Sequence, residues 1–129
     1  MENSRGVKFG AVPQLILIVE DEALIRVDAA ESLRLSGYRV HEAANATEAM
    51  DSLQSEFVVD LLFTDINLGK GMSGIELAML ALAKLPSLKI LGTTGDTLKH
   101  VLPAVLGKIL PKPYALTDLL LRVQYALAT

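Results

Sequence analysis

The chain has no cysteine among its 129 residues, and positive charge is nowhere concentrated along it. Without cysteine there are no disulfides and no thiolate metal ligands, so a packed apolar core has to hold the fold together. Acidic and basic residues are mixed and give a formal net charge of −3. Because binding to a phosphate backbone requires clustered basic residues, we expect no direct contact with nucleic acid.

The first apolar segment is too short to cross a membrane. QLILIV, residues 14–19, falls far below the roughly 20 apolar residues that a spanning helix needs. The acidic EDE directly behind it is unlike a signal-peptide cleavage site. We therefore expect a cytoplasmic protein with no membrane contact, and the chain length suits one ordinary domain.

Strand-like and helix-like patterns alternate along the chain. Residues 1–14 lack periodicity and are expected to form a flexible N-terminal lead-in to a domain over residues 15–129. Apolar or alternating runs predict five strands, at residues 15–19, 38–43, 60–65, 88–93 and 107–110. Helical patterns lie at residues 20–37, stopping at Gly37, and at 45–54, 74–85 and 115–128.

This alternation predicts an α/β fold, a doubly wound five-stranded parallel sheet of the flavodoxin-like kind. One interval is irregular, because Pro103 interrupts LKHVLPAVLG between the fourth and fifth strands. We therefore expect a shortened or irregular fourth helix. On the first helix, the apolar spacing predicts a buried face made of Ala23, Val27, Ala30 and Leu33.

Polar side chains gather where the predicted strands end, and in an open parallel sheet that edge carries the ligand site. Three carboxylates crowded together repel one another unless a cation compensates them, and hard oxygen ligands suit Mg²⁺. A lysine and a hydroxyl opposite suit the oxygens of a phosphoryl group. The residues at the strand ends are Glu20, Asp21, Asp65, Thr93, Thr94 and Lys112.

Four segments, VEDE, LLFTDINLGKGMSGIEL, GTTGD and LPKP, resemble the receiver domain of two-component response regulators. The likeness runs from about Leu15 to the C-terminus. It implies that Asp65 accepts a phosphoryl group from a histidine kinase or a phosphotransfer protein. It also implies that Glu20, Asp21, Asp65 and the backbone carbonyl of Asn67 hold Mg²⁺.

The same resemblance implies that Lys112 pairs with the phosphoryl group and that a hydroxyl moves toward it. Thr94 matches the motif better than Thr93, because Thr-Gly follows the strand, but the choice between them stays open. Since Lys112 would meet phosphate rather than metal, its removal is expected to spare folding and metal binding. The resemblance further implies a cis bond between Lys112 and Pro113.

Two features depart from the family pattern or add to it. Ile109 stands where many receivers have an aromatic residue that reports phosphorylation, so the relay of the signal is expected to differ. Residues 74–85 contain few charges, so part of the set Leu77, Met79, Leu80 and Leu82 should stay exposed. Cover by neighbouring loops is as good an explanation as a contact with a partner or a homodimer.

We expect a stand-alone receiver that is not an enzyme and that signals by protein contact or phosphorelay to an unknown target. Two alternatives remain. An aspartate-nucleophile phosphatase resembling the haloacid dehalogenase family also uses a strand-end aspartate, but there the nucleophile lies near the chain start with an acid two residues later. A receiver-like module that has lost phosphorylation is the other. His41 and His100 are assigned no role.

Overall fold

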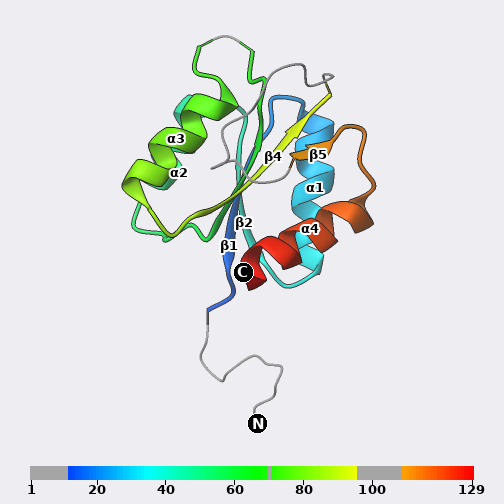
Figure 1. The fold of residues 1–129 in the computed structure, drawn as a ribbon. Helices are drawn as coiled ribbons and strands as arrows, with labels where there is room; N and C mark the ends of the chain where they lie inside the picture. Colours follow the sequence, from blue (N-terminus) through cyan, green and yellow to red (C-terminus); the bar gives the residue numbers. More distant parts are fainter. Residues whose placement is uncertain (1–11, 70, 96–108) are drawn as a thin grey trace.

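The computed structural model describes residues 12–69, 71–95 and 109–129. Within these ranges five strands form one parallel sheet in the order β2-β1-β3-β4-β5 (Figure 1). The strands are β1 (Leu15–Val19), β2 (Arg39–Ala43), β3 (Leu61–Asp65), β4 (Lys89–Thr94) and β5 (Ile109–Pro111). The helices are α1 (Ala23–Leu35), α2 (Ala46–Leu53), α3 (Gly74–Lys84) and α4 (Leu116–Ala128). The predicted doubly wound five-stranded parallel sheet is confirmed.

Helices cover both faces of the sheet, with α2 and α3 on one side and α1 and α4 on the other (Figure 1). Successive strand side chains point to opposite faces, so β1 contributes to two separate cores. Leu15 and Leu17 pack in the core that includes residues of α2 and α3, whereas Ile16 and Ile18 pack with residues of α1 and α4. A strand buried on both faces reads as an unbroken apolar run, which is why LILIV was recognisable.

The sheet order reverses between β1 and β3, since β2 lies on one side of β1 and β3 on the other. Val19 is the register partner of Thr64, so the residues that follow Val19 emerge beside Asp65. In open parallel sheets this reversal opens a crevice at the carboxyl ends of the strands. The topology therefore places the predicted site at the edge where β1 and β3 end.

Local signals in the sequence set the helix ends. The Asn45 side chain accepts a hydrogen bond from the Glu48 amide at the start of α2, and Ser73 and Glu76 form a reciprocal capping box at the start of α3. Gly37, with a φ of 101°, follows α1 in the left-handed region that favours glycine. The predicted irregular fourth helix, with Pro103, and residues 1–11 of the lead-in lie outside the described residues.

Two predictions about helix faces had different outcomes. On α1, Ala30 and Leu33 are buried as expected, but the inclusion of Ala23 and Val27 was wrong, because both are exposed. The helix is rotated so that Ala29 completes its buried face. On α3, Leu77 is buried, and the expected exposure is confirmed at the residues Met79 and Leu80, which are 47% and 46% exposed.

No helix within the described ranges is long and apolar enough to cross a membrane.

Candidate functional site

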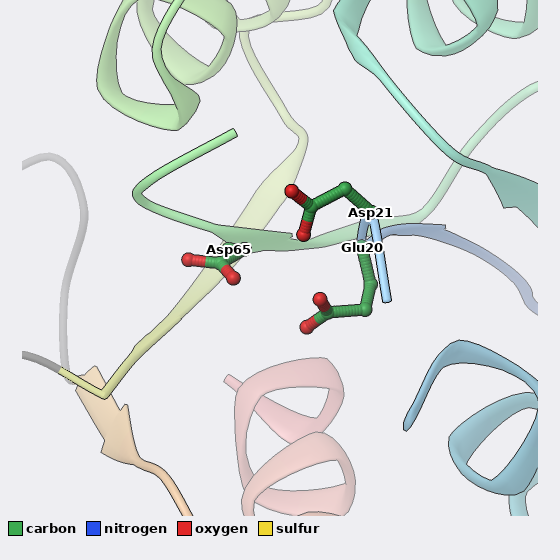
Figure 2. Close-up of side chains that lie close together, drawn as sticks. All are labelled: Glu20, Asp21 and Asp65. Atoms are coloured by element: carbon green, nitrogen blue, oxygen red, sulfur yellow. The ribbon is translucent and has the colours of Figure 1, made fainter. Parts of the chain in front are cut away.

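Three carboxylates meet at the carboxyl edge of the sheet, as the sequence predicted. Glu20 and Asp21 directly follow β1, and Asp65 is the last residue of β3. One ligand oxygen from each lies within 4.8 Å of the others, and the side chains face a common space (Figure 2). Glu20 and Asp65 are only 3% and 6% exposed, whereas Asp21 is exposed to solvent. Two of the three charges are therefore almost removed from water.

The backbone around Asp65 is fixed by close packing behind it. The Ile66 amide donates to the Thr93 carbonyl at 2.9 Å, and the Gly74 amide donates to the Ile66 carbonyl at 2.8 Å. A Cβ atom at position 74 would lie 1.9 Å from the Asp65 carbonyl oxygen, so only glycine allows α3 to begin this close to β3. The Asn67 amide donates to Asp65 Oδ1 at 2.9 Å and holds the carboxylate in place.

Lys112 reaches the two buried carboxylates from the end of β5. Its Nζ lies 2.6 Å from Glu20 Oε1 and 2.6 Å from Asp65 Oδ2, and 4.0 Å from Glu22 Oε1. The Lys112 amide donates to the Thr94 carbonyl at 2.9 Å, which fixes the start of the side chain. The predicted convergence of acids and ammonium is confirmed, and so is the cis bond between Lys112 and Pro113.

Burial and charge shift the ionisation of these groups in a connected way. Burial raises the pKa of Glu20, although the bond to Lys112 works in the opposite direction. Burial lowers the pKa of Lys112, but hydrogen bonds and charge from Asp65 and Glu20 outweigh it and hold that pKa above its ordinary value. Lys112 therefore stays charged at neutral pH, and one ammonium shared by two acids leaves Glu20 incompletely compensated.

The two threonines at the end of β4 lie in different surroundings. The Thr93 hydroxyl donates to the Leu110 carbonyl at 2.6 Å and joins β4 to β5 within the sheet. The Thr94 hydroxyl accepts a hydrogen bond from the Asn67 side-chain amide at 3.4 Å, two residues after Asp65. Both side chains are buried. The arrangement favours Thr94 as the hydroxyl that faces the site and Thr93 as a structural residue.

The donor chemistry fits a divalent metal ion. Glu20, Asp21 and Asp65 carry three negative charges and Lys112 carries one positive charge, which leaves a net charge of two negative units. Oxygen donors in this number, without sulfur or imidazole among them, suit Mg²⁺. Gly69 lies close by, since a Cβ there would come 3.9 Å from Asp21 Oδ2. The cluster is thus an acidic site whose residual charge matches one Mg²⁺.

Sequence reasoning missed Arg26, which contacts this site from α1. Its Nη1 donates to the Glu20 carbonyl at 2.8 Å. The position follows Asp21 by five residues, and a cation at that spacing after an acidic pair was the available signal. It could not be interpreted alone, because the rotation of α1 decides whether Arg26 faces the strand or the solvent. Of the two histidines, His41 packs edge-on against Phe57, and His100 lies outside the described residues.

The sequence and the fold of this chain have counterparts among known proteins. A family model described as the response regulator receiver domain matches residues 16–124. Transcriptional regulatory protein PdtaR of Mycobacterium tuberculosis is 34% identical over 122 residues, which cover 92% of this chain and 58% of that protein. Sensor kinase CckA of Brucella abortus is 34% identical over 81% of this chain and 11% of its own length. The chain therefore spans little more than half of the first of these relatives and a small part of the second.

A CheY-like response regulator receiver domain protein from Methanospirillum hungatei superposes with a TM-score of 0.83 and 30% identity, covering 91% of this chain and 95% of that one. The receiver domain of the hybrid histidine kinase CckA superposes with a TM-score of 0.75 and 33% identity, covering 88% and 98% of the two chains. The matched family consists of signalling regulators, which leaves the phosphatase alternative without support. The chain belongs to the response regulator receiver domain family of two-component signalling.

Proposed function

We propose that Asp65 is the phosphoacceptor of this receiver domain and that the reaction requires Mg²⁺. The observation that carries the proposal is the position of its carboxylate, which lies between two further acids and the Lys112 ammonium, 2.6 Å from Nζ. A carboxylate nucleophile attacking a phosphoryl group needs cations to neutralise the charge on the transferring oxygens. This site supplies one cation of its own and a place for a second.

In the proposed reaction an Asp65 carboxylate oxygen attacks the phosphorus of a phosphohistidine. A new O–P bond forms while the N–P bond to the donor imidazole breaks, and the imidazole leaves. Bound Mg²⁺ would neutralise phosphoryl charge, held by Glu20, Asp21 and Asp65 with the backbone carbonyl of Asn67. Lys112 would exchange its bond to Asp65 for the phosphoryl oxygens, and the Thr94 hydroxyl would donate to one of them.

Exposure to Mg²⁺ and a small acyl phosphate, followed by intact-mass measurement, tests this assignment. We expect a phosphoryl adduct on the native chain, its loss in Asp65→Asn, and its retention in the matched control Asp51→Asn, which alters an exposed aspartate on α2. Steady turnover of a phosphomonoester without an adduct would favour the phosphatase alternative. Neither adduct nor turnover would favour a receiver that has lost phosphorylation.

Membership of the receiver family supports a histidine kinase or a histidine phosphotransfer protein as the phosphodonor. A cytoplasmic location is part of the proposal, because such donors draw their phosphate from ATP. The output is either a phosphorylation-dependent contact with a target protein or transfer of the phosphoryl group along a relay. Mixing the phosphorylated chain with an unphosphorylated phosphotransfer protein distinguishes these routes, since only a relay returns the phosphoryl group to histidine.

A contact through α3, including a homodimer, also belongs to the proposal. It is supported by the exposure of Met79 and Leu80 on a helix with few charges. Sedimentation velocity over a range of concentrations, with and without phosphorylation, measures the association. Leu80→Glu should abolish it, whereas Leu121→Glu on the exposed face of α4 is the matched control. A monomer under every condition, with donor recognition unchanged in Leu80→Glu, would remove this part of the proposal.

A further inference from the structure

Arg26 connects the acidic site to the neighbouring edge strand. From α1 its Nη1 donates to the backbone carbonyl of Glu20 at 2.8 Å, and its Nε lies 3.5 Å from Glu42 Oε1 on β2. Glu42 is held from its other oxygen by Arg34, whose Nη1 lies 3.0 Å from Oε2. Arg34 in turn donates to the Val40 carbonyl at 2.8 Å. The guanidinium of Arg26 is therefore fixed on both sides, and its side chain is 18% exposed.

The Glu20 backbone is tied at both of its polar groups. Its amide donates to the Ala43 carbonyl at the end of β2 at 3.0 Å, and its carbonyl accepts from Arg26. The Glu20 carbonyl and the Asp21 amide belong to the same rigid peptide plane. Holding that carbonyl therefore fixes the orientation of the plane from which the Asp21 side chain departs.

Orientation of this plane matters most for Asp21. Glu20 and Asp65 are buried, and their carboxylates are held by Lys112 and by backbone amides. The Asp21 side chain is exposed, and its carboxylate lies beside those of the other two acids (Figure 2). Its distance from the other two carboxylates thus depends on the backbone that carries it.

We propose that Arg26 is a positioning residue for divalent-cation binding, acting through the Glu20–Asp21 peptide plane and braced by Glu42. The inference rests on the proposed function, because it assumes that Glu20, Asp21 and Asp65 are the residues that take the ion. Arg26 does not touch the ion. It sets the geometry in which the three carboxylates reach it together.

Charge alone predicts the opposite effect, which makes the inference testable. Arg26 is a cation whose guanidinium contacts the residue next to Asp21, and removing a nearby positive charge strengthens cation binding. If Arg26 acts only as a charge, Arg26→Met binds Mg²⁺ more tightly than the native chain. If it holds the peptide plane, Arg26→Met binds Mg²⁺ more weakly despite the gain in electrostatic attraction.

Titration calorimetry with MgCl₂ alone, without any phosphodonor, measures the affinity. We expect Arg26→Met to weaken binding by at least about fivefold and Arg26→Lys by a smaller factor, since lysine keeps the charge but lacks the planar fork that reaches both partners. Arg34→Met is the matched control: it removes one positive charge from the same helix together with Arg34's own ion pair to Glu42, but leaves Arg26 bonded to the Glu20 carbonyl. Its affinity should stay within about twofold of the native value.

Thermal unfolding in metal-free buffer checks that each variant is folded. If Arg26→Met does not fold, Arg26→Lys carries the test, since it keeps the charge but lacks the planar fork that reaches both partners. Binding in Arg26→Met and Arg26→Lys equal to or tighter than in the native chain would overturn the inference and leave the proposed function intact. Absence of Mg²⁺ binding in the native chain itself would instead overturn the proposed function and the inference with it.

Discussion

Replacement of Lys112 by methionine removes the one cation that the buried acids share in the described structure and keeps most of the side-chain volume. Nζ lies 2.6 Å from an oxygen of Glu20 and 2.6 Å from an oxygen of Asp65, and all three side chains are at most 13% exposed. From the sequence alone this change was expected to spare folding and metal binding. The double contact revises both expectations.

The magnitude follows from the cost of leaving buried charges without a partner. Removing one member of a buried ion pair costs about 3–5 kcal/mol. Protonation limits this cost, because burial already raises the pKa of Glu20 and a neutral Glu20 can donate to Asp65. We therefore expect Lys112→Met to lower the free energy of unfolding by about 3 kcal/mol in metal-free buffer at neutral pH, the lower end of the roughly 3–5 kcal/mol cost of breaking a buried ion pair.

Metal binding should change in the opposite direction. In the native chain a bound Mg²⁺ would have to share carboxylate oxygens with an ammonium. Two like-signed cations a few ångströms apart repel by about 4 kcal/mol per pair of unit charges at an effective dielectric constant near 20. Even after Lys112 moves aside, we expect Lys112→Met to bind Mg²⁺ at least about tenfold more tightly, which corresponds to about 1.4 kcal/mol. Saturating Mg²⁺ should then restore most of the lost stability.

Urea unfolding and titration calorimetry, each with and without MgCl₂, measure these two effects. Lys84→Met is the matched control, since it removes an exposed lysine from α3. Native-like stability of Lys112→Met without metal, together with unchanged Mg²⁺ affinity, would refute the reasoning, because it would mean that the ammonium does not compensate the two acids in solution.

Three further predictions concern single residues of the site. Gly74→Ala should destabilise the fold by about 3 kcal/mol or more in urea unfolding, because its Cβ would lie 1.9 Å from the Asp65 carbonyl oxygen and the backbone would have to shift; a change below 1 kcal/mol would contradict the close approach. Thr93→Val should lower stability by about 1–2 kcal/mol through loss of the buried bond to Leu110, whereas Thr94→Val should mainly weaken the response to phosphorylation, read from amide chemical shifts. Mg²⁺ affinity should fall as the pH decreases through the pKa of Glu20, which burial raises above its ordinary 4.5, because the metal binds the deprotonated acid. In metal-free buffer the contribution of Glu20 to stability should instead fall as the pH rises through that pKa. Calorimetry at several pH values should show a smaller pH dependence in Glu20→Gln.

Much of the fold could be predicted because its signals are local. The run from Leu15 to Val19 has the length and composition of a strand buried on both faces, and β1 has those bounds in the structure. Asp65 was placed at a strand end because an apolar run stops there and a glycine-containing loop follows. Parallel strands bring their carboxyl ends to one edge, so the convergence of the acids with Lys112 followed from the topology alone.

The contacts that tune the site could not be predicted in the same way. Ala23 and Val27 fit an apolar face as well as Ala29 does, and the rotation of α1 is decided by packing against the sheet and by Arg26 bonding to Glu20. Helix periodicity restricts the possible faces but does not choose between neighbouring ones. The sharing of one ammonium by two carboxylates likewise depends on the placement of the Lys112, Glu20 and Asp65 side chains, which a sequence pattern does not specify.

The packing behind the site indicates how a change at Asp65 can reach β5 without an aromatic at position 109. A Cβ at Gly92 would lie 2.7 Å from Ile109 Cδ1 and 3.6 Å from Ile66 Cγ1, so both isoleucines crowd the space that this glycine leaves open. Ile66 directly follows Asp65, and the Thr93 hydroxyl bonds β4 to β5 at the next residue pair. Because β4 and β5 are joined in this way, a displacement of Ile66 would be expected to move both strands together. A larger side chain at position 92 would have to displace Ile109, so the contact of β4 with β5 at this point depends on glycine.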